Sequence, residues 1–255
     1  MKGLKPAILF LTIISAYSTF SQDHKPAYNS DEKLKYLMYY GWFDGGYANL
    51  DITNDTLNSE DVYHVRMHAK TIGLTDKLYH VSDIYESYFN PQTGLPIKAI
   101  RNISEGKYRY YNEVKFNQKE NFVQSEKSGK IEVPENCFDI LSSLYHLRNV
   151  LSNTDLKQDT VIKLDSYFSD EVFPLLLRYH GKERIETKLG EIDCIKFLPV
   201  VEVGRVFETE DDMEIWFSDD KNRLPVRVKF HLFVGALKCD LIEYSGLMYD
   251  FVIDD

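Results

Sequence analysis

The sequence predicts a mainly β protein: a single curved antiparallel sheet with one principal helix packed against it. Two observations predict this class. Apolar and polar residues alternate with a period of two in many short segments, and tight turns rich in Asp, Asn and Gly separate these segments. Frequent short strands joined by tight turns are typical of antiparallel sheets, whereas parallel sheets alternate strands with helices.

The N-terminus is expected to be a secretory signal peptide. Lys2 and Lys5 precede an apolar run over residues 7–17, and a polar stretch begins at Ser21. We place the cleavage site after residue 21, which leaves 22–255 as a single β-rich domain. The run is shorter than the roughly 20 residues of a membrane span. No Cys lies near the cut, so we expect an exported, soluble, periplasmic or extracellular protein without a lipid anchor or, after cleavage, a transmembrane segment. An uncleaved N-terminal anchor is the alternative.

The alternation is clearest in the predicted strand 63–69. Tyr63, Val65, Met67 and Ala69 share one face of this strand, and polar residues occupy the other face. The other predicted strands are 35–43, 47–52, 84–89, 96–103, 108–116, 160–168, 173–180, 182–187, 192–198, 213–217, 224–232 and 236–244. A short helical turn is expected over 74–78.

One longer helix is predicted over 139–151. Asp139 is a suitable N-cap, and Ile140, Leu144 and Leu147 recur at helical spacing on one face. A helix of this length is long enough to cover one face of the sheet.

Two hairpins repeat the same order of residues. In each, two aromatic residues ending at Phe89 or Phe217 lead through a polar turn to Leu-Pro, at Pro96 or Pro225. Pro at the start of a strand removes a hydrogen bond where the ladder needs it least. The repeat predicts two similar hairpins, although unrelated hairpins of this length can share the form.

These hairpins resemble those of periplasmic lipoprotein carriers. The resemblance implies an open half-barrel with helices against its concave face. A longer resemblance, to the exported bacterial family called domain of unknown function 3108, covers most of the chain after residue 21. It is carried by the stretches 40–46, 93–96, 105–108, 138–142, 204–207 and 216–220. That family implies no activity, cofactor or catalytic residue.

The charge of the chain excludes one class of partner. Thirty Lys and Arg against 40 Asp and Glu give a formal net charge of −10. An acidic surface repels phosphate backbones, so we expect no nucleic-acid partner. The same net charge disfavours adhesion of the whole surface to anionic lipid.

No motif for catalysis, metal binding or cofactor binding is found in the sequence, so we predict no catalytic residue, metal or cofactor. His64 and His68 are four residues apart, but on a strand this spans about 13 Å, too far for one metal ion. Cys137, Cys194 and Cys239 are an odd number of thiols, so at most one disulfide can form.

We expect a non-enzymatic envelope protein that binds a hydrophobic or amphipathic ligand, such as a lipid, in the concave sheet. The high aromatic content, 18 Tyr and 15 Phe, suits such a surface. The candidate ligand-binding residues are Tyr63, Val65, Met67, Ala69, Ile140, Leu144 and Leu147. Two alternatives remain: an enzyme that acts on an envelope or extracellular polymer, and a structural module that docks on another envelope protein.

Overall fold

A computed structural model describes residues 25–199, 213–232 and 235–253. The predicted signal peptide and the stretch 204–207 lie outside these residues. The strands, in chain order, are β1 (Lys33–Tyr40), β2 (Phe43–Leu57), β3 (Glu60–Thr71), β4 (Ser82–Phe89), β5 (Pro96–Glu105), β6 (Tyr108–Asn117), β7 (Phe122–Ser125), β8 (Gly129–Glu132), β9 (Val161–Phe168), β10 (Glu171–Thr187), β11 (Gly190–Pro199), β12 (Met213–Ser218), β13 (Pro225–His231) and β14 (Ala236–Ser245). The helices are α1 (Gly73–Leu78) and α2 (Ile140–Asn153).

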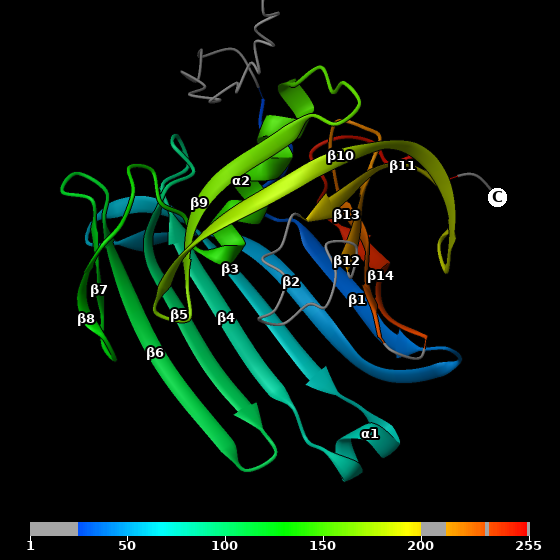
Figure 1. The fold of residues 1–255 in the computed structure, drawn as a ribbon, viewed down its shortest axis with the longest axis horizontal. Helices are drawn as coiled ribbons and strands as arrows, with labels where there is room; N and C mark the ends of the chain where they lie inside the picture. The colour runs from blue at the N-terminus through cyan, green and yellow to red at the C-terminus, as the bar shows by residue number, and fades with distance from the viewer. Residues whose placement is uncertain (1–24, 200–212, 233–234, 254–255) are drawn as a thin grey trace, which may run out of the picture.

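All described strands belong to one antiparallel sheet. Its order is β8-β7-β6-β5-β4-β3-β2-β1-β14-β13-β12-β11-β10-β9, so strands adjacent in the chain are paired throughout, except across α2. The pairing of β1 with β14 joins the two halves of the chain. The sheet curves strongly, and α2 lies within the curve (Figure 1). The predicted fold class is therefore confirmed.

The two hairpins with repeated sequence have the same geometry. Phe89 pairs with Pro96 and Phe217 pairs with Pro225, and in both hairpins the register shifts immediately before the Phe. Each Pro opens its strand, as the sequence predicts.

Several elements differ from the predicted ones. The predicted strand 35–43 is split by the turn at Gly41, whose φ of +57° suits glycine. The predicted strands 173–180 and 182–187 are one strand, β10, because the ladder only shifts register near Gly181. Strands β7 and β8 were not predicted, since four residues each are too few for a periodic pattern.

Helix α2 begins as the sequence predicts. The carboxylate of Asp139 accepts hydrogen bonds from the backbone N–H groups of Leu141 (2.8 Å) and Ser142 (3.2 Å). The Ser142 hydroxyl in turn accepts one from the Asp139 backbone N–H at 3.0 Å. This capping box satisfies donors that a helix start leaves without partners.

The helix fills the centre of the curved sheet. Tyr145 packs edge-on against Tyr28 and lies beside Phe89 of β4, in a cluster that includes Leu34 and Val65. On the other side of the helix, buried side chains form a second apolar cluster. Its buried members are Phe138, Leu147, Val150, Leu151, Ile162, Leu164, Leu177, Tyr179, Ile195, Phe197 and Phe217.

A buried ion pair fixes α2 in this position. The guanidinium of Arg148 donates to both carboxylate oxygens of Glu32, at 2.6 and 2.7 Å, and both side chains are 0% exposed. The same guanidinium donates to the backbone oxygens of Ala27 (3.2 Å) and Asn222 (3.1 Å). Burial alone would lower the pKa of Arg148, but Glu32 more than offsets this and raises it. One side chain thus joins the N-terminal segment, the helix and the turn between β12 and β13.

A second polar cluster connects the two outer parts of the sheet. The turn between β9 and β10 places Asp170 against β6 and β7, where its carboxylate accepts hydrogen bonds from Tyr167 (2.9 Å), Ser125 (2.9 Å) and Asn112 (3.3 Å). Partial burial raises the pKa of Asp170, but these hydrogen bonds outweigh it and hold that pKa below its usual value. In the described residues no strand ladder joins β8 to β9. Besides these side chains, an isolated backbone bridge between Phe138 and Ser166 links the segment before α2 to β9.

None of the described helices is both long and apolar enough to cross a membrane.

Replacing Glu32 tests the buried ion pair. We expect Glu32→Ala to lower the free energy of unfolding by about 3–5 kcal/mol, because it leaves the Arg148 charge buried and unpaired. Urea titration measures this change. The control is Glu243→Ala, since Glu243 pairs with Lys35 at the surface and such pairs contribute at most about 1 kcal/mol. Equal effects of the two substitutions would contradict the assigned role.

Replacing Asp170 tests the side-chain connection across the sheet. Asp170→Asn removes the charge but keeps a residue type that tolerates the observed φ of +63°. We expect a loss of about 1–3 kcal/mol in the free energy of unfolding, because an amide accepts these hydrogen bonds less well. Asp159→Asn is the matched control, since Asp159 has the same φ of +63° in an exposed turn. A loss no larger than that of the control would argue against the connection.

Candidate functional site

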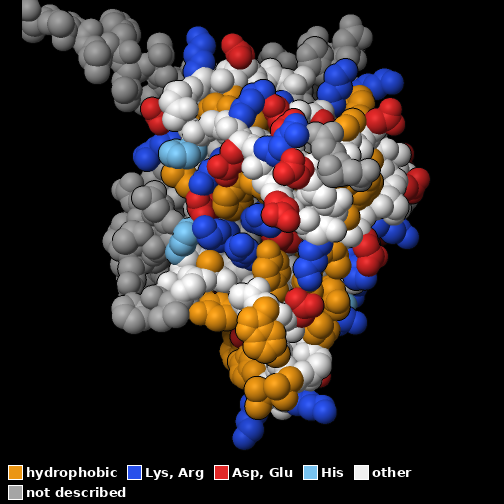
Figure 2. Space-filling model, turned by 90° about the vertical axis from the view of Figure 1, so that its right-hand side faces the viewer, with side chains coloured by type: hydrophobic (Ala, Val, Ile, Leu, Met, Phe, Trp, Pro, Cys, Tyr) orange, Lys and Arg blue, Asp and Glu red, His pale blue; other side chains and the backbone are white. Residues whose placement is uncertain are grey.

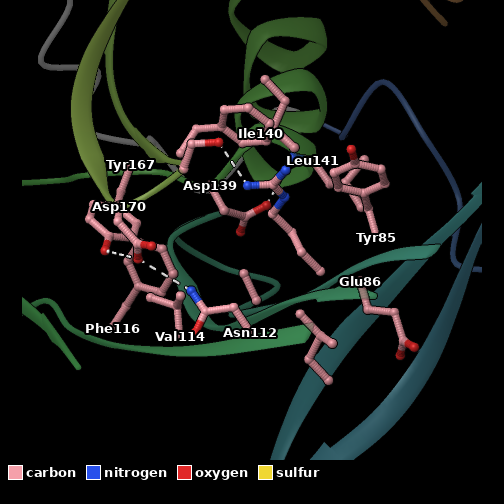
Figure 3. Close-up of a pocket in the computed structure, with 15 residues that line it drawn as sticks. Tyr85, Glu86, Asn112, Val114, Phe116, Asp139, Ile140, Leu141, Tyr167 and Asp170 are labelled. Atoms are coloured by element: carbon pink, nitrogen blue, oxygen red, sulfur yellow. Dashed lines mark hydrogen bonds between the residues drawn. The ribbon is translucent and has the colours of Figure 1, made fainter. Parts of the chain in front are cut away.

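A pocket lies beneath the N-terminal end of α2, between β4, β5 and β6 and the turn that joins β9 to β10 (Figure 3). We call it the Arg101 pocket, after the only Lys or Arg among its lining residues. Its lining residues are Tyr85, Glu86, Ala99, Ile100, Arg101, Asn112, Val114, Phe116, Asp139, Ile140, Leu141, Tyr167, Phe168, Ser169 and Asp170. Figure 3 shows that the side chain of Glu86 points away from the start of α2.

Arg101 of β5 is held among aromatic rings. Its guanidinium carbon lies 4.4 Å from the ring centre of Phe168, 5.2 Å from that of Tyr110 and 5.7 Å from that of Tyr85. One terminal nitrogen donates to the Ser169 hydroxyl at 2.8 Å. The buried Nε atom has no hydrogen-bond partner among the described residues. Arg101 is thus a cation with an unused donor, positioned by rings.

Asp139 and Asp170 are both part of the lining, but their pKa values are shifted in opposite directions. Burial raises the pKa of Asp139, although hydrogen bonds from Ser87 and Ser142 oppose that rise. The pKa of Asp170 is lowered by hydrogen bonds from hydroxyl groups, those of Tyr167 and Ser125 foremost, which outweigh the effect of burial. Two carboxyl groups with opposed pKa shifts in one pocket are typical of acid–base pairs. In this pocket, however, Asp139 also caps α2 and Asp170 also connects the sheet.

The pocket is small. The space open to a water-sized molecule is about 30 Å³, while one water needs about 10–15 Å³. The pocket therefore admits one or two waters as it stands, and an acyl chain would have to displace side chains. Its wall is mainly apolar, with Ala99, Val114, Phe116, Ile140 and Leu141 among the lining residues.

The structure places the seven candidate ligand-binding residues around α2. Val65 and Leu147 are fully buried in the core. Tyr63, Met67 and Ala69 pack against the cluster that contains Val65, and Leu144 packs against both clusters. Only Ile140 is also part of the Arg101 pocket. The contact of these residues with a ligand stays a prediction.

The remaining candidates from the sequence are found in separate environments. His64 Nε2 lies 2.7 Å from Glu86 and His68 Nε2 lies 3.0 Å from Ser82. Cys137, Cys194 and Cys239 are all free thiols, and burial raises the pKa of each to about 12. Among the described residues, no three His, Cys, Asp or Glu side chains come together in a way that could hold a metal ion.

Sequence reasoning missed Arg101 and Asp170. Arg101 lies in a predicted strand, two residues after Ala99. Residues two apart on a strand face the same side of the sheet, so this spacing was the available signal that Arg101 shares a face with Ala99. Asp170 lies in a turn after Ser169, and nothing local indicates that its partners come from β6 and β7.

One solved structure with a TM-score above 0.5 shares this fold. No curated protein matches the chain. A β-barrel-like protein of the domain of unknown function DUF1849 from Brucella abortus is similar in structure, with a TM-score of 0.57 and 8% identity over 86% of this chain and 98% of that one. A DUF1089 family protein from Pseudomonas aeruginosa has a TM-score of 0.42 and 8% identity, over 84% of this chain and 97% of that one. The model of the family described as "Protein of unknown function (DUF3108)" matches residues 35–242, and the chain therefore belongs to this family.

Proposed function

We propose that this protein is a non-catalytic binding protein for an amphipathic anion, such as a fatty acid or another lipid with an anionic head. One observation carries the proposal: the buried Nε of Arg101 belongs to an apolar pocket and has no hydrogen-bond partner within the part of the chain that the structure describes. Buried donors in proteins nearly always have partners, so an orphan suggests a missing acceptor. Arg favours carboxylate and phosphate acceptors because its donors match their geometry.

The size of the pocket limits how such a ligand binds. Only the anionic head group would approach Arg101, displacing the water that the pocket admits. The apolar tail would leave along Ile140, which is exposed, and along Phe168, which also lines the pocket. In this proposal α2 stays in place, and the residues that it buries in the centre of the sheet contact the ligand only indirectly.

We also propose that the protein is exported to the periplasm or the cell exterior, after removal of residues 1–21. The support is the basic start, the apolar run and the small residues of the N-terminus. N-terminal sequencing of the protein purified from cells is expected to give Gln22 as the first residue, within a few positions. A sequence that begins at Met1 would contradict cleavage.

Titration of wild-type protein and an Arg101→Met variant tests the binding proposal. We expect dodecanoate and dodecyl phosphate to bind wild-type protein, and dodecanol to bind at least about tenfold more weakly, because a hydrogen bond to a charged group contributes about 1.5–3 kcal/mol. Arg101→Met should reduce anion binding by a similar factor. Calorimetry and native mass spectrometry measure both effects.

Arg66→Met is the matched control. Arg66 follows Val65 on β3 and so belongs to the opposite face of the sheet from the core. It should leave binding unchanged. Equal affinity for dodecanol and dodecanoate, or no loss in Arg101→Met, would overturn the proposal.

A catalytic role is the second candidate, since the pKa values of Asp139 and Asp170 shift in opposite directions. It predicts that wild-type protein cleaves an envelope polysaccharide and that Asp170→Asn does not. Cleavage that survives in Asp170→Asn, or no cleavage by wild-type protein, would reject it. Both carboxylates already accept structural hydrogen bonds, and this favours the binding role.

A further inference from the structure

Exposed hydrophobic side chains gather at one end of the sheet. This end carries the turns β1–β2, β5–β6 and β13–β14 and helix α1, which lies at the opposite end of the sheet from the top of α2 (Figure 1). More than half of the large exposed hydrophobic residues in the described chain belong to it. They are Tyr40, Trp42, Leu74, Leu78, Tyr79, Tyr108, Leu232 and Leu237, and we call them the apolar rim.

Backbone contacts hold the tips of the rim together. The Ile72 N–H, just before α1, donates to the Gly45 oxygen at 3.1 Å, which fixes α1 beside the start of β2. The Gly106 N–H donates to the His80 oxygen at 2.7 Å, which fixes the β5–β6 turn beside the end of α1. Tyr40 pairs with Leu237 across β1 and β14. The rim is therefore one continuous edge rather than a set of separate loops.

The most exposed members of the rim lie outside the core. Trp42 is 93% exposed and Leu78 is 77% exposed, and no residue of α1 is buried. Exposed apolar groups gathered in one patch mark interaction sites on proteins. Trp and Tyr in particular are enriched at the boundary between water and lipid.

The charges of the rim differ from those of the chain as a whole. Among the described residues, Lys77, Lys107 and Lys238 form no ion pair with a carboxylate, while Asp76 is bound by Thr71 and His80. Asp44, next to the β1–β2 turn, lies 3.6 Å from Lys188. Lys77, Lys107 and Lys238 are therefore positive charges on the described rim that no carboxylate neutralises by an ion pair.

A groove with basic side chains lies directly beside the rim. It has a volume of about 520 Å³, and Lys188 and Lys238 both approach the ring of Tyr39 in its wall. Figure 2 shows hydrophobic side chains at the lower end of this face, with Lys and Arg side chains both above them and at the lowest tip. Apolar groups flanked by basic side chains match the interface of a bilayer with anionic head groups.

We propose that the apolar rim docks the protein on the surface of a phospholipid bilayer that contains anionic lipid. Trp42, Leu74 and Leu78 enter the head-group region, and Lys77, Lys107 and Lys238 contact lipid phosphates. A bilayer fits better than a protein partner, because protein interfaces are depleted in Lys whereas membrane-surface segments combine Lys with Trp and Leu. This site is separate from the Arg101 pocket and does not depend on it.

The net charge of −10 does not prevent this docking. At about 0.1 M salt the Debye length is about 10 Å, so acidic groups on distant parts of the surface are screened from the bilayer. The charges nearest the lipid decide the interaction, and these are the unpaired lysines of the rim.

Sedimentation with vesicles tests the proposal. The probes are vesicles of phosphatidylcholine with and without phosphatidylglycerol. We expect the wild-type chain to bind both, and to bind better when phosphatidylglycerol is present at low salt. The double variant Trp42→Ser, Leu78→Ser should bind about tenfold more weakly, because interfacial binding scales with the apolar area that enters the lipid.

The matched control is Val172→Ser, Val252→Ser, which removes two exposed apolar side chains outside the rim. It should bind vesicles as wild-type protein does. All variants share the same N-terminal residues, so any contribution of that segment is common to them. Thermal unfolding verifies that each variant is folded. Arg101→Met should also bind vesicles normally, which separates this proposal from the ligand proposal.

Tryptophan fluorescence gives an independent measurement. Trp42 is exposed, whereas Trp216 is 5% exposed and donates to Glu183. Vesicles should shift the emission of wild-type protein to shorter wavelength, and Trp42→Phe should lose this shift while still sedimenting with vesicles. Absence of vesicle binding by wild-type protein, or unchanged binding in the rim variant, would overturn the proposal. A wild-type dimer that the rim variant abolishes, without vesicle binding, would identify the rim as a contact between copies.

Discussion

The buried pair of Arg148 and Glu32 is the constraint on which the rest of the structure depends. Two opposite charges without solvent exposure are stable together only when nearly every donor is satisfied, and here the guanidinium also contacts the backbone of Ala27 and Asn222. The pair fixes the rotation and depth of α2 inside the sheet. With α2 in that position, the centre of the curve is packed, and free space is left at the start of the helix.

The packed centre separates two kinds of surface. At the start of α2, the Arg101 pocket combines an unused donor with an apolar wall. At the far end of the sheet, the tips around Trp42 and α1 expose hydrophobic groups that the core does not use. A protein that exchanges an amphipathic molecule with a membrane needs both features: a site for the charged head and a surface that reaches the lipid. The two proposals are thus compatible, although each has its own test.

The sequence predicted features whose signal is local. The period-two alternation of 63–69, the N-cap at Asp139 and the paired hairpins at Pro96 and Pro225 all depend on neighbouring residues, and the structure contains each of them. It did not predict that Arg148 meets Glu32, 116 positions away, or that Asp170 reaches Ser125. Such pairs arise from how the whole sheet curves, so no local pattern encodes them. The candidate residues on β3 pack in the core around α2, and their contact with a ligand stays a prediction.

Hydrogen exchange of the amides in α2 tests the central claim most directly. If the buried pair fixes the helix permanently, the amides of 144–151 should exchange only through global unfolding. They should then exchange as slowly as the amides at the centre of β1 to β3, and Glu32→Ala should speed the exchange of both groups equally. Exchange of the helix that is much faster than that of these strands in the wild-type protein would contradict the account. The helix would then move away from the sheet transiently, and the space that it fills at the centre of the sheet would be available to a ligand.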